Sequence, residues 1–515
     1  MLLQLFQFVV IFTAPSLFYD VLAEERDGGA TVEIQQSPVG NGTPEVQIAV
    51  ADIPLYFSPY AMSPLEAQYA HLFFDPLVRW STHKELEKRL VSGWLLLKPG
   101  VIRFFLKKEI SFHSGNKLSS DDVIWTLDQI RKTPHAKAFF TGILKIEKVD
   151  QHSFDLHTDL SEDQLLDYLA HFFVLDHAFY ESHNITMNNS QDIVNFNSKT
   201  LPISGSGPYK INQYNPLLHL RVVSNDKYWG ETNVIAGFNF IRIHSANSRL
   251  YALLAEDVDI CESMAKKDID TVSHAPSKKL VEISSSEVVF LTISDKRSNV
   301  FKRRVARDAV ALSINKMGML KHIVNNLGSV KPYFTAQQNI GDKENKELLE
   351  YDARTARNIF SKITMPAELH LLVLVDKAGN TAQIARALLN MMQKVSIKLT
   401  ITEVSDLQKW NAMSGDYDFT LSSWQFPLLN RDNIYQHLFT DSPLSQYIDA
   451  LFAESLSDNT LASKISLFEQ SQESQWIMPL LFLNTVWASD DKYDLASIFS
   501  INSIPYWHLL TVNKP

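Results

Sequence analysis

Residues 369–403 carry the most regular hydrophobic pattern in the chain. Residues 369–375 form an apolar run interrupted only by His370, which is typical of a strand buried on both faces. Residues 382–395 place apolar side chains at i, i+4, i+7, i+8 and i+11, the spacing of one helix face, and residues 397–402 alternate as a second strand. Strand, helix and strand at this spacing predict a parallel βαβ unit with a right-handed crossover.

The same sheet is predicted to continue through a helix at residues 405–413 and a short strand at residues 417–421. The chain then enters a long loop that carries Trp424, Pro427 and Asp432. Ligands of open α/β sheets bind beyond the carboxyl ends of the strands, and Trp424 lies three residues past such an end. We therefore predict that Trp424 contacts a ligand; the alternative is a tryptophan that only packs in the core.

Shorter patterns predict the remaining elements. Strands are predicted at residues 46–50, 94–97, 101–107, 209–214, 218–223, 257–260 and 288–293. Helices are predicted at residues 64–74, 248–254 and 304–327. A further helix follows Ser119 and Asp122, which have the spacing of a capping box. Because helices and strands are interspersed and a βαβ unit is present, the predicted fold class is α/β with mixed sheets.

Length and charge restrict the possible functions. A chain of 515 residues is too long for one small core, so two or three domains are expected. The 58 acidic residues outnumber the 48 basic ones, which argues against a nucleic-acid partner because phosphate binding requires a basic surface. The densest basic group, at residues 302–307, has near-helical spacing and is interpreted as a solvated helix face.

The N-terminus has the composition of an export signal. Residues 1–19 carry no charge, and residues 2–12 form an apolar run too short to span a bilayer. Val21 and Ala23 supply the residues of a cleavage site, so residues 1–23 are interpreted as a signal peptide, with an uncleaved anchor or a misassigned start as alternatives. Residues 24–45 are polar and are expected to form a flexible mature N-terminus.

Cysteine and histidine usage argues against thiol and metal chemistry. Cys261 is the only cysteine, so no intramolecular disulfide can form, and its place beside a predicted buried strand favours an inert core thiol. With the export signal, this favours a periplasmic protein of a Gram-negative bacterium. His171, His177 and His183 recur every six residues, a spacing that faces one side of neither a helix nor a strand. We expect no metal and no cofactor.

Motifs of common catalytic sites are missing from the sequence. It contains no phosphate-binding P-loop, no nucleophile elbow, no HExxH pair and no CxxC pair. The adjacent acids at residues 121–122 and the acids Asp257 and Asp259 are explained by helix capping and turns. The protein is therefore not expected to be an enzyme.

Several short motifs occur in a fixed order between residues 46 and 485. They are FHSGNKLSSDDV at Phe112–Val123, GSGPY at Gly205–Tyr209, YWG at Tyr228–Gly230, LAEDVDI at Leu254–Ile260, the helix from Arg307 to Asn315, and GDYD at Gly415–Asp418 before Trp424. In this order the chain resembles the family 5 extracytoplasmic solute-binding proteins, the receptor subunits of peptide- and nickel-type ABC transporters. The glycine of the family's LxxGxxDI motif is lost here, so that Leu254–Ile260 is one residue shorter than the motif.

The resemblance implies a periplasmic binding protein-like fold of two lobes and three domains. Domain I would comprise residues 46–60, 200–280 and 490–515; domain II would comprise 61–199, and domain III would comprise 281–489 with the Trp424 loop. The receptor would trap an oligopeptide or related polar solute by hinge closure and deliver it to an inner-membrane ABC permease. We expect a monomer.

The resemblance also indicates which residues would bind the ligand. The candidate contacts are Trp424 for stacking, Ser423 and Gln425 for main-chain groups, and Asp432 and Arg431 as the nearest charges. In peptide-binding members, an aspartate three residues after the tryptophan pairs with the α-ammonium of the peptide. Pro427 occupies that position here, and an ammonium buried without a carboxylate would cost roughly several kcal/mol.

Two alternative functions stay open. The C-terminal half also resembles the solute-binding domains of sugar-phosphate-stress transcription regulators, through Ile477–Leu480 and Tyr506-Trp507. The chain could accordingly be a ligand-sensing regulator, although an export signal stands where those regulators carry a helix-turn-helix. The second alternative is a periplasmic interaction protein that binds no small ligand.

Overall fold

The computed structural model describes residues 45–513. Within this range it leaves out residues 56, 58–63, 84, 133–139, 141, 186–202, 232–234, 266–267, 335–348, 427 and 454–459. The predicted signal peptide at residues 1–23, residues 24–44 of the predicted flexible terminus, and Pro427 lie outside the described residues.

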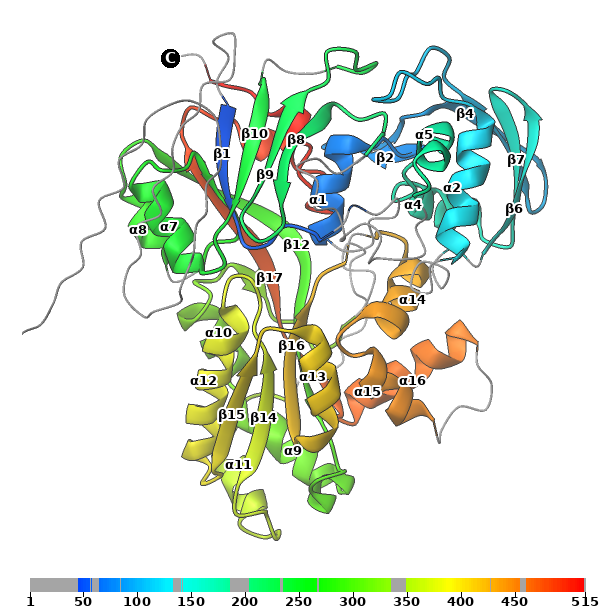
Figure 1. Cartoon of the computed structure of the whole chain (residues 1–515). Helices are drawn as coiled ribbons and strands as arrows, with labels where there is room; N and C mark the ends of the chain where they lie inside the picture. The colour runs from blue at the N-terminus through cyan, green and yellow to red at the C-terminus, as the bar shows by residue number, and fades with distance from the viewer. Residues whose placement is uncertain are drawn as a thin grey trace, which may run out of the picture. The chain divides into compact units, whose positions relative to one another are not determined.

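One mixed sheet runs through most of the described chain (Figure 1). Its order is β15-β14-β16-β12-β17-β11-β1-β10-β9-β8, with β13 paired to β17. The strands are β1 (Glu45–Val50), β8 (Tyr209–Asn215), β9 (His219–Ser224), β10 (Gly237–Arg242), β11 (Ile260–Cys261), β12 (Lys278–Ile293), β13 (Gly328–Ser329), β14 (Leu369–Leu374), β15 (Leu399–Val404), β16 (Phe419–Trp424) and β17 (Ile477–Asp490). This arrangement confirms the predicted α/β class.

Two long strands join the two ends of this sheet. β12 has 16 residues and β17 has 14, and they pair antiparallel along most of their length. Between Ile283 and Glu287 the register shifts, because four steps along β12 oppose two steps along β17, from Thr485 to Leu483. Such a bulge interrupts the ladder and allows the pair to bend.

The predicted βαβ unit is confirmed. β14 and β15 are parallel and are connected by α12 (Asn380–Lys394), and α13 (Leu407–Met413) leads to β16, which is also parallel to β14. The apolar face of α12 is buried at Ile384, Leu388 and Met392, as its spacing predicts. The other described helices of eight or more residues outside residues 61–199 are α7 (Ala246–Leu254), α9 (Arg304–Ser313), α11 (Ala353–Phe360), α14 (Arg431–Asp441), α15 (Ser445–Phe452) and α16 (Leu461–Glu473).

Two small sheets are built from residues 78–158. β2 (Val78–Trp80) pairs with β3 (Leu86–Lys88), and a four-stranded sheet has the order β4 (Val91–Lys98), β5 (Val101–Leu106), β7 (Ser153–Thr158), β6 (Ile143–Asp150). The described helices between residues 61 and 199 are α1 (Pro64–Phe73), α2 (Ser120–Lys132), α4 (Glu162–Leu169) and α5 (His177–Ser182). The backbone N–H and Oγ of Ser119 both donate to Asp122 Oδ2 at 2.8 Å, so these two residues cap α2 as predicted.

Several predicted elements are wrong in their boundaries. The strand predicted at residues 257–260 is only β11 (Ile260–Cys261), and the one predicted at residues 288–293 is the end of β12, which begins at Lys278. The single helix expected at residues 304–327 is two helices, α9 and α10 (Lys316–His322), because the Asn315 side chain accepts from the Gly318 N–H and caps a new helix. The strand expected to end at Leu421 continues to Trp424, because every residue of β16 pairs with β12.

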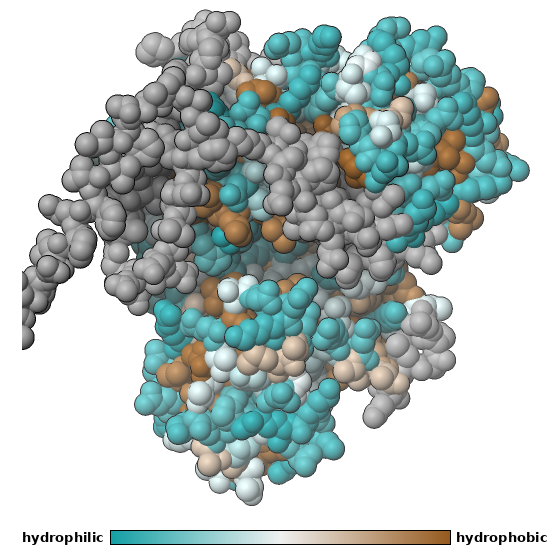
Figure 2. All heavy atoms as spheres, viewed as in Figure 1, coloured by the Kyte–Doolittle hydropathy of each residue, from teal (hydrophilic) through white to brown (hydrophobic). Residues whose placement is uncertain are grey.

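The predicted solvated basic face is also wrong for one of its members. Arg307 is buried, its guanidinium lies 4.0 Å from the ring centre of Trp476, and it donates to the carbonyls of Phe301 and Ser474. Lys302 and the next two arginines are exposed. Figure 2 shows hydrophilic residues over most of the described surface on one face, with hydrophobic residues in separate patches. None of the described helices is long and apolar enough to cross a bilayer.

Candidate functional site

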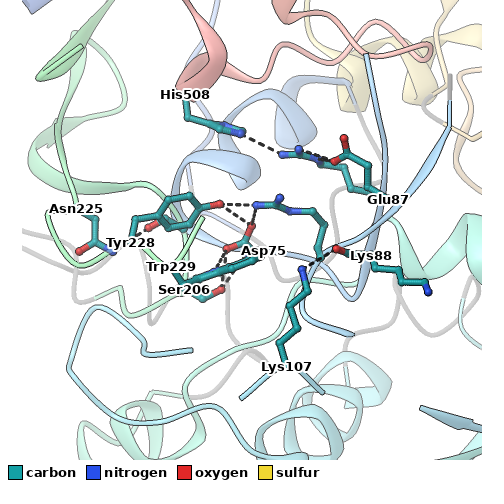
Figure 3. Close-up of polar contacts among 12 residues, drawn as sticks. Asp75, Glu87, Lys88, Lys107, Ser206, Asn225, Tyr228, Trp229 and His508 are labelled. Atoms are coloured by element: carbon teal, nitrogen blue, oxygen red, sulfur yellow. Dashed lines mark hydrogen bonds and ion pairs between the residues drawn. The ribbon is translucent and has the colours of Figure 1, made fainter. Parts of the chain in front are cut away.

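Two of the sequence motifs, GSGPY and YWG, meet at the buried carboxylate of Asp75 (Figure 3). It accepts from Arg89 Nη2 at 3.0 Å, Trp229 Nε1 at 3.0 Å, Tyr228 Oη at 3.1 Å and Ser206 Oγ at 3.2 Å. A carboxylate offers about four acceptor sites. These four donors therefore saturate Asp75, and we call these five residues the Asp75 junction.

The charge of Arg89 is held inside this junction. Burial acts to lower the pKa of Arg89, but the neighbouring Asp75 carboxylate and the Tyr228 hydroxyl outweigh it and raise the pKa above its usual value. The guanidinium also lies 4.7 Å from the ring centre of Trp229, which adds a cation–π contact. Arg79 donates to Glu87 Oε2 at 2.6 Å and lies 3.2 Å from His508 Nε2; Glu87 and His508 are labelled in Figure 3.

The GSGPY motif is explained by close backbone packing at this junction. A Cβ on Gly205 would lie 2.0 Å from the carbonyl oxygen of Phe73, and one on Gly207 would lie 2.4 Å from the Phe73 carbonyl carbon. His113 Nε2 lies 2.9 Å from the Gly207 carbonyl and must donate to it. Burial lowers the pKa of His113 to about 4, despite this hydrogen bond, which acts to raise it.

A cavity of about 600 Å³ is the candidate ligand site. Its lining combines residues 244–247 and 263–265 with residues 374–380, 423–425 and 484–486. These segments come from both ends of the large sheet and from β17, which joins them. The volume lies within the range of about 300–1,000 Å³ that is typical of small-molecule sites.

The structure brings together three of the five predicted contacts. Ser423, Trp424 and Gln425 all line the cavity. Arg431 and Asp432 are not part of its lining; they begin α14, where an Asp432 carboxylate oxygen lies 3.5 Å from the side-chain nitrogen of Gln164 in α4. Arg431 and Asp432 therefore do not line the cavity together with the other three predicted contacts.

Trp424 lines the cavity and also packs in the core. It is the last residue of β16 and is 5% exposed. Its ring lies 4.6 Å from that of Phe426, 5.6 Å from that of His437 and 6.1 Å from that of Phe334. The strand holds this side chain in place, so the packing and ligand-contact interpretations are compatible.

The connection between β14 and α12 supplies cavity residues that sequence reasoning missed. Asp376 Oδ1 accepts from the backbone N–H of Thr381 at 2.7 Å and from its hydroxyl at 2.8 Å, which fixes this turn at the start of α12. Lys377 Nζ lies 3.3 Å from Glu262 Oε1, and fully buried Arg249 donates to the Lys377 carbonyl. The sequence signal that could have identified these cavity residues is the position of the turn after the carboxyl end of β14.

Among the described residues there is no site for thiol or metal chemistry. They contain no group of three or more His, Cys, Asp or Glu side chains that could hold a metal ion. Cys261 is fully buried, and burial raises the pKa of its thiol to about 12, so it stays protonated at neutral pH. His171 is buried whereas His183 is exposed, as expected of histidines that do not act together.

Comparison with curated proteins gives two kinds of relative. The transcriptional regulator SgrR of Photorhabdus laumondii is 25% identical over 276 residues, covering 52% of this chain and 44% of the regulator. The nickel-binding protein NikA of Staphylococcus aureus is 21% identical over 357 residues, covering 68% of each chain. The chain thus spans less than half of the regulator's length.

A solved structure and a family model identify the fold and the family of this chain. The periplasmic binding protein DppA of Helicobacter pylori, solved with the peptide STSA, superposes with a TM-score of 0.72 at 17% identity, covering 91% of this chain and 98% of DppA. This likeness confirms the predicted binding-protein fold. The family model of bacterial extracellular solute-binding proteins, family 5, matches residues 85–446. Because this match spans more than half of its length, the chain belongs to the family 5 solute-binding proteins, which are not enzymes.

Proposed function

We propose that this protein is a periplasmic receptor of a Gram-negative bacterium that encloses an oligopeptide or related polar solute in the cavity. After hinge closure it delivers the solute to an inner-membrane ABC permease. The peptide bound by DppA and the nickel named for NikA support a small polar ligand and leave its identity open. The predicted division into three domains, with the cavity between domains I and III, is part of this proposal.

The observation that carries the proposal is the composition of the cavity wall. Ser263 and Met264 follow β11 on one side of the β12–β17 pair, whereas Ser423 and Trp424 end β16 on the other side. A solute that touches both groups stabilises the arrangement in which they are close together. The bulge at residues 283–287 lies on β12 beside the lining residue Glu287, which suits a hinge next to the ligand.

A thermal-shift screen tests the proposal. The probes are di- to pentapeptides, oligosaccharides, sugar phosphates and the nickel–histidine complex, and at least one is expected to raise the melting temperature. The screen is repeated with Trp424→Phe and with Trp410→Phe. Trp410 is also buried, but it packs on Leu372 and does not line the cavity.

Trp424→Phe is expected to weaken binding of the stabilising probe about three- to tenfold. Replacing the indole removes part of an aromatic contact worth about 0.5–1.5 kcal/mol. Trp410→Phe should lower the melting temperature of the free protein without changing the dissociation constant. If the two variants changed binding equally, Trp424 would not be a ligand contact. A screen without any stabilising probe would favour the ligand-free interaction protein.

The match to SgrR makes a ligand-sensing regulator the second candidate. Cell fractionation separates the two functions. A receptor is recovered from the periplasmic extract with its first residues removed, as mass spectrometry of the intact protein would show. A regulator is recovered from the cytoplasm with residues 1–23 intact.

A further inference from the structure

We propose that the cavity selects an uncharged polar solute, bound through hydroxyl or amide groups. This inference rests on the proposed receptor function and narrows its ligand. The lining contains six ionisable residues, three acids and three bases: Asp52, Asp376, Glu287, His244, Lys377 and Arg386. The side chains of these residues interact mainly with the protein, and the uncharged side chains of the wall are left to bind the ligand.

The basic side chains of the wall are paired with acids. Lys377 Nζ is 3.3 Å from Glu262 Oε1, and Glu262 is 3% exposed. Arg386 Nη2 is 3.5 Å from Glu403 Oε1. His244 Nδ1 is 4.0 Å from a carboxylate oxygen of Asp52. An anionic ligand would have to compete with these carboxylates for Lys377 and Arg386.

The acidic side chains of the wall are equally engaged. The Nε and Nη2 atoms of Arg242 donate to Asp52 Oδ1 at 3.1 and 3.0 Å. Asp376 accepts three hydrogen bonds from Asn380 and Thr381 at the start of α12, where the helix dipole also favours its charge. Glu287 also has an interaction within the protein. A cationic ligand would have to compete with Arg242 for Asp52, and with Asn380 and Thr381 for Asp376.

Uncharged side chains of the wall are available instead. Asn247, Gln383, Ser405 and Gln425 line the cavity, and their side chains make no hydrogen bond to the described residues. Amides and hydroxyls both donate and accept, so they match the hydroxyl groups of a sugar or the amide groups of a peptide backbone. A buried ligand charge, in contrast, has to be compensated by a partner of opposite charge. Neutral sugars and end-blocked peptides share the required chemistry.

Matched ligand pairs test the charge preference in the purified mature protein. One pair is a tetrapeptide with free termini and the same peptide N-acetylated and C-amidated; the other is a trisaccharide and its phosphorylated form. Calorimetry is expected to give at least tenfold tighter binding of the uncharged member of one pair. That binding should change less than twofold between 50 and 500 mM NaCl. The pair whose uncharged member binds shows whether the ligand is a peptide or a saccharide.

The outcomes separate this inference from the receptor function. Equal or tighter binding of a charged member overturns the charge preference and leaves the receptor function standing. No heat with any member, together with no stabilisation in the broader screen, overturns both. Binding that weakens steeply with salt also contradicts the inference, because it reveals a charge pair between ligand and wall.

A substitution that adds a charge tests the wall itself. Gln425→Glu places a carboxylate with no built-in partner in the cavity and is expected to shift the affinity ratio at least tenfold toward the peptide with a free ammonium. Gln470→Glu adds the same charge on the exposed surface of α16, away from the cavity, and should leave the ratio unchanged. An unchanged affinity ratio in a folded Gln425→Glu protein would show that the side chain at this position does not determine the preference for ligand charge.

Discussion

The Asp75 junction and the cavity are both assembled from distant parts of the chain, but they are built in opposite ways. In the junction, one carboxylate receives four donors, and glycines allow backbones to touch. In the cavity, the ionisable residues of the lining interact with other protein groups, and uncharged side chains of the lining make no hydrogen bond to the described residues. The junction uses its polar groups to hold the protein together, whereas the cavity keeps polar groups available.

Removing the central carboxylate is expected to have the largest effect on stability. Asp75→Asn leaves the Arg89 guanidinium buried without its counter-charge, so the free energy of unfolding should fall by about 3–5 kcal/mol. Urea denaturation measures this change. The matched control is Asp155→Asn, which breaks the Arg103–Asp155 pair on the four-stranded sheet and should cost less than about 1 kcal/mol. Similar losses in the two variants would contradict the special role of the junction.

Acid should destabilise the packing beside the Asp75 junction through His113, which contacts the Gly207 carbonyl. Its pKa is about 4 in the folded protein and about 6.5 when unfolded, so the unfolded chain binds more protons between these values. The contribution of His113 to the free energy of unfolding is therefore complete above pH 6.5. It falls by up to about 3 kcal/mol as the pH drops to 4. His113→Gln should flatten the pH dependence of the unfolding free energy in that window. His183→Gln, at an exposed histidine, should keep the wild-type slope.

A single methyl group is expected to disturb the backbone packing of the junction. Gly205→Ala places a Cβ 2.0 Å from the Phe73 carbonyl oxygen, so the two backbones must separate, at a cost of about 1–3 kcal/mol. Thermal unfolding should show a lower melting temperature. Gly415→Ala is the control, because no atom lies within 4 Å of its Cβ. Equal melting temperatures for both variants would show that the backbones can separate without cost.

The smallest effect on stability is expected in the cavity. Gln383→Ala removes a side chain without hydrogen-bond partners among the described residues and should change the free energy of unfolding by less than about 0.5 kcal/mol. The same variant should weaken binding of the solute found in the screen. A large loss of stability would show that cavity side chains also hold the fold, and the contrast between the two regions would disappear.

The sequence predicts these two regions to very different degrees. The residues around Gly205 and Tyr228 form recognisable motifs because a fixed backbone contact and a saturated carboxylate tolerate few alternatives. The cavity turn at residues 374–380 has no comparable motif, since many side chains can line a space. The position of Trp424 on β16 was also misjudged by three residues, because Ser422 and Ser423 suggest a loop although both pair with β12.

The bulge between β12 and β17 has a consequence for the entropy of binding. If the two ends of the sheet close on a solute, the paired stretches of β12 and β17 confine the motion to bending and twisting at their two register shifts, at residues 283–287 and 289–290. The open protein then explores few arrangements, and enclosing a solute removes little conformational freedom. Much of the contact energy at the cavity wall is then available as affinity, even for a neutral solute held only by hydrogen bonds.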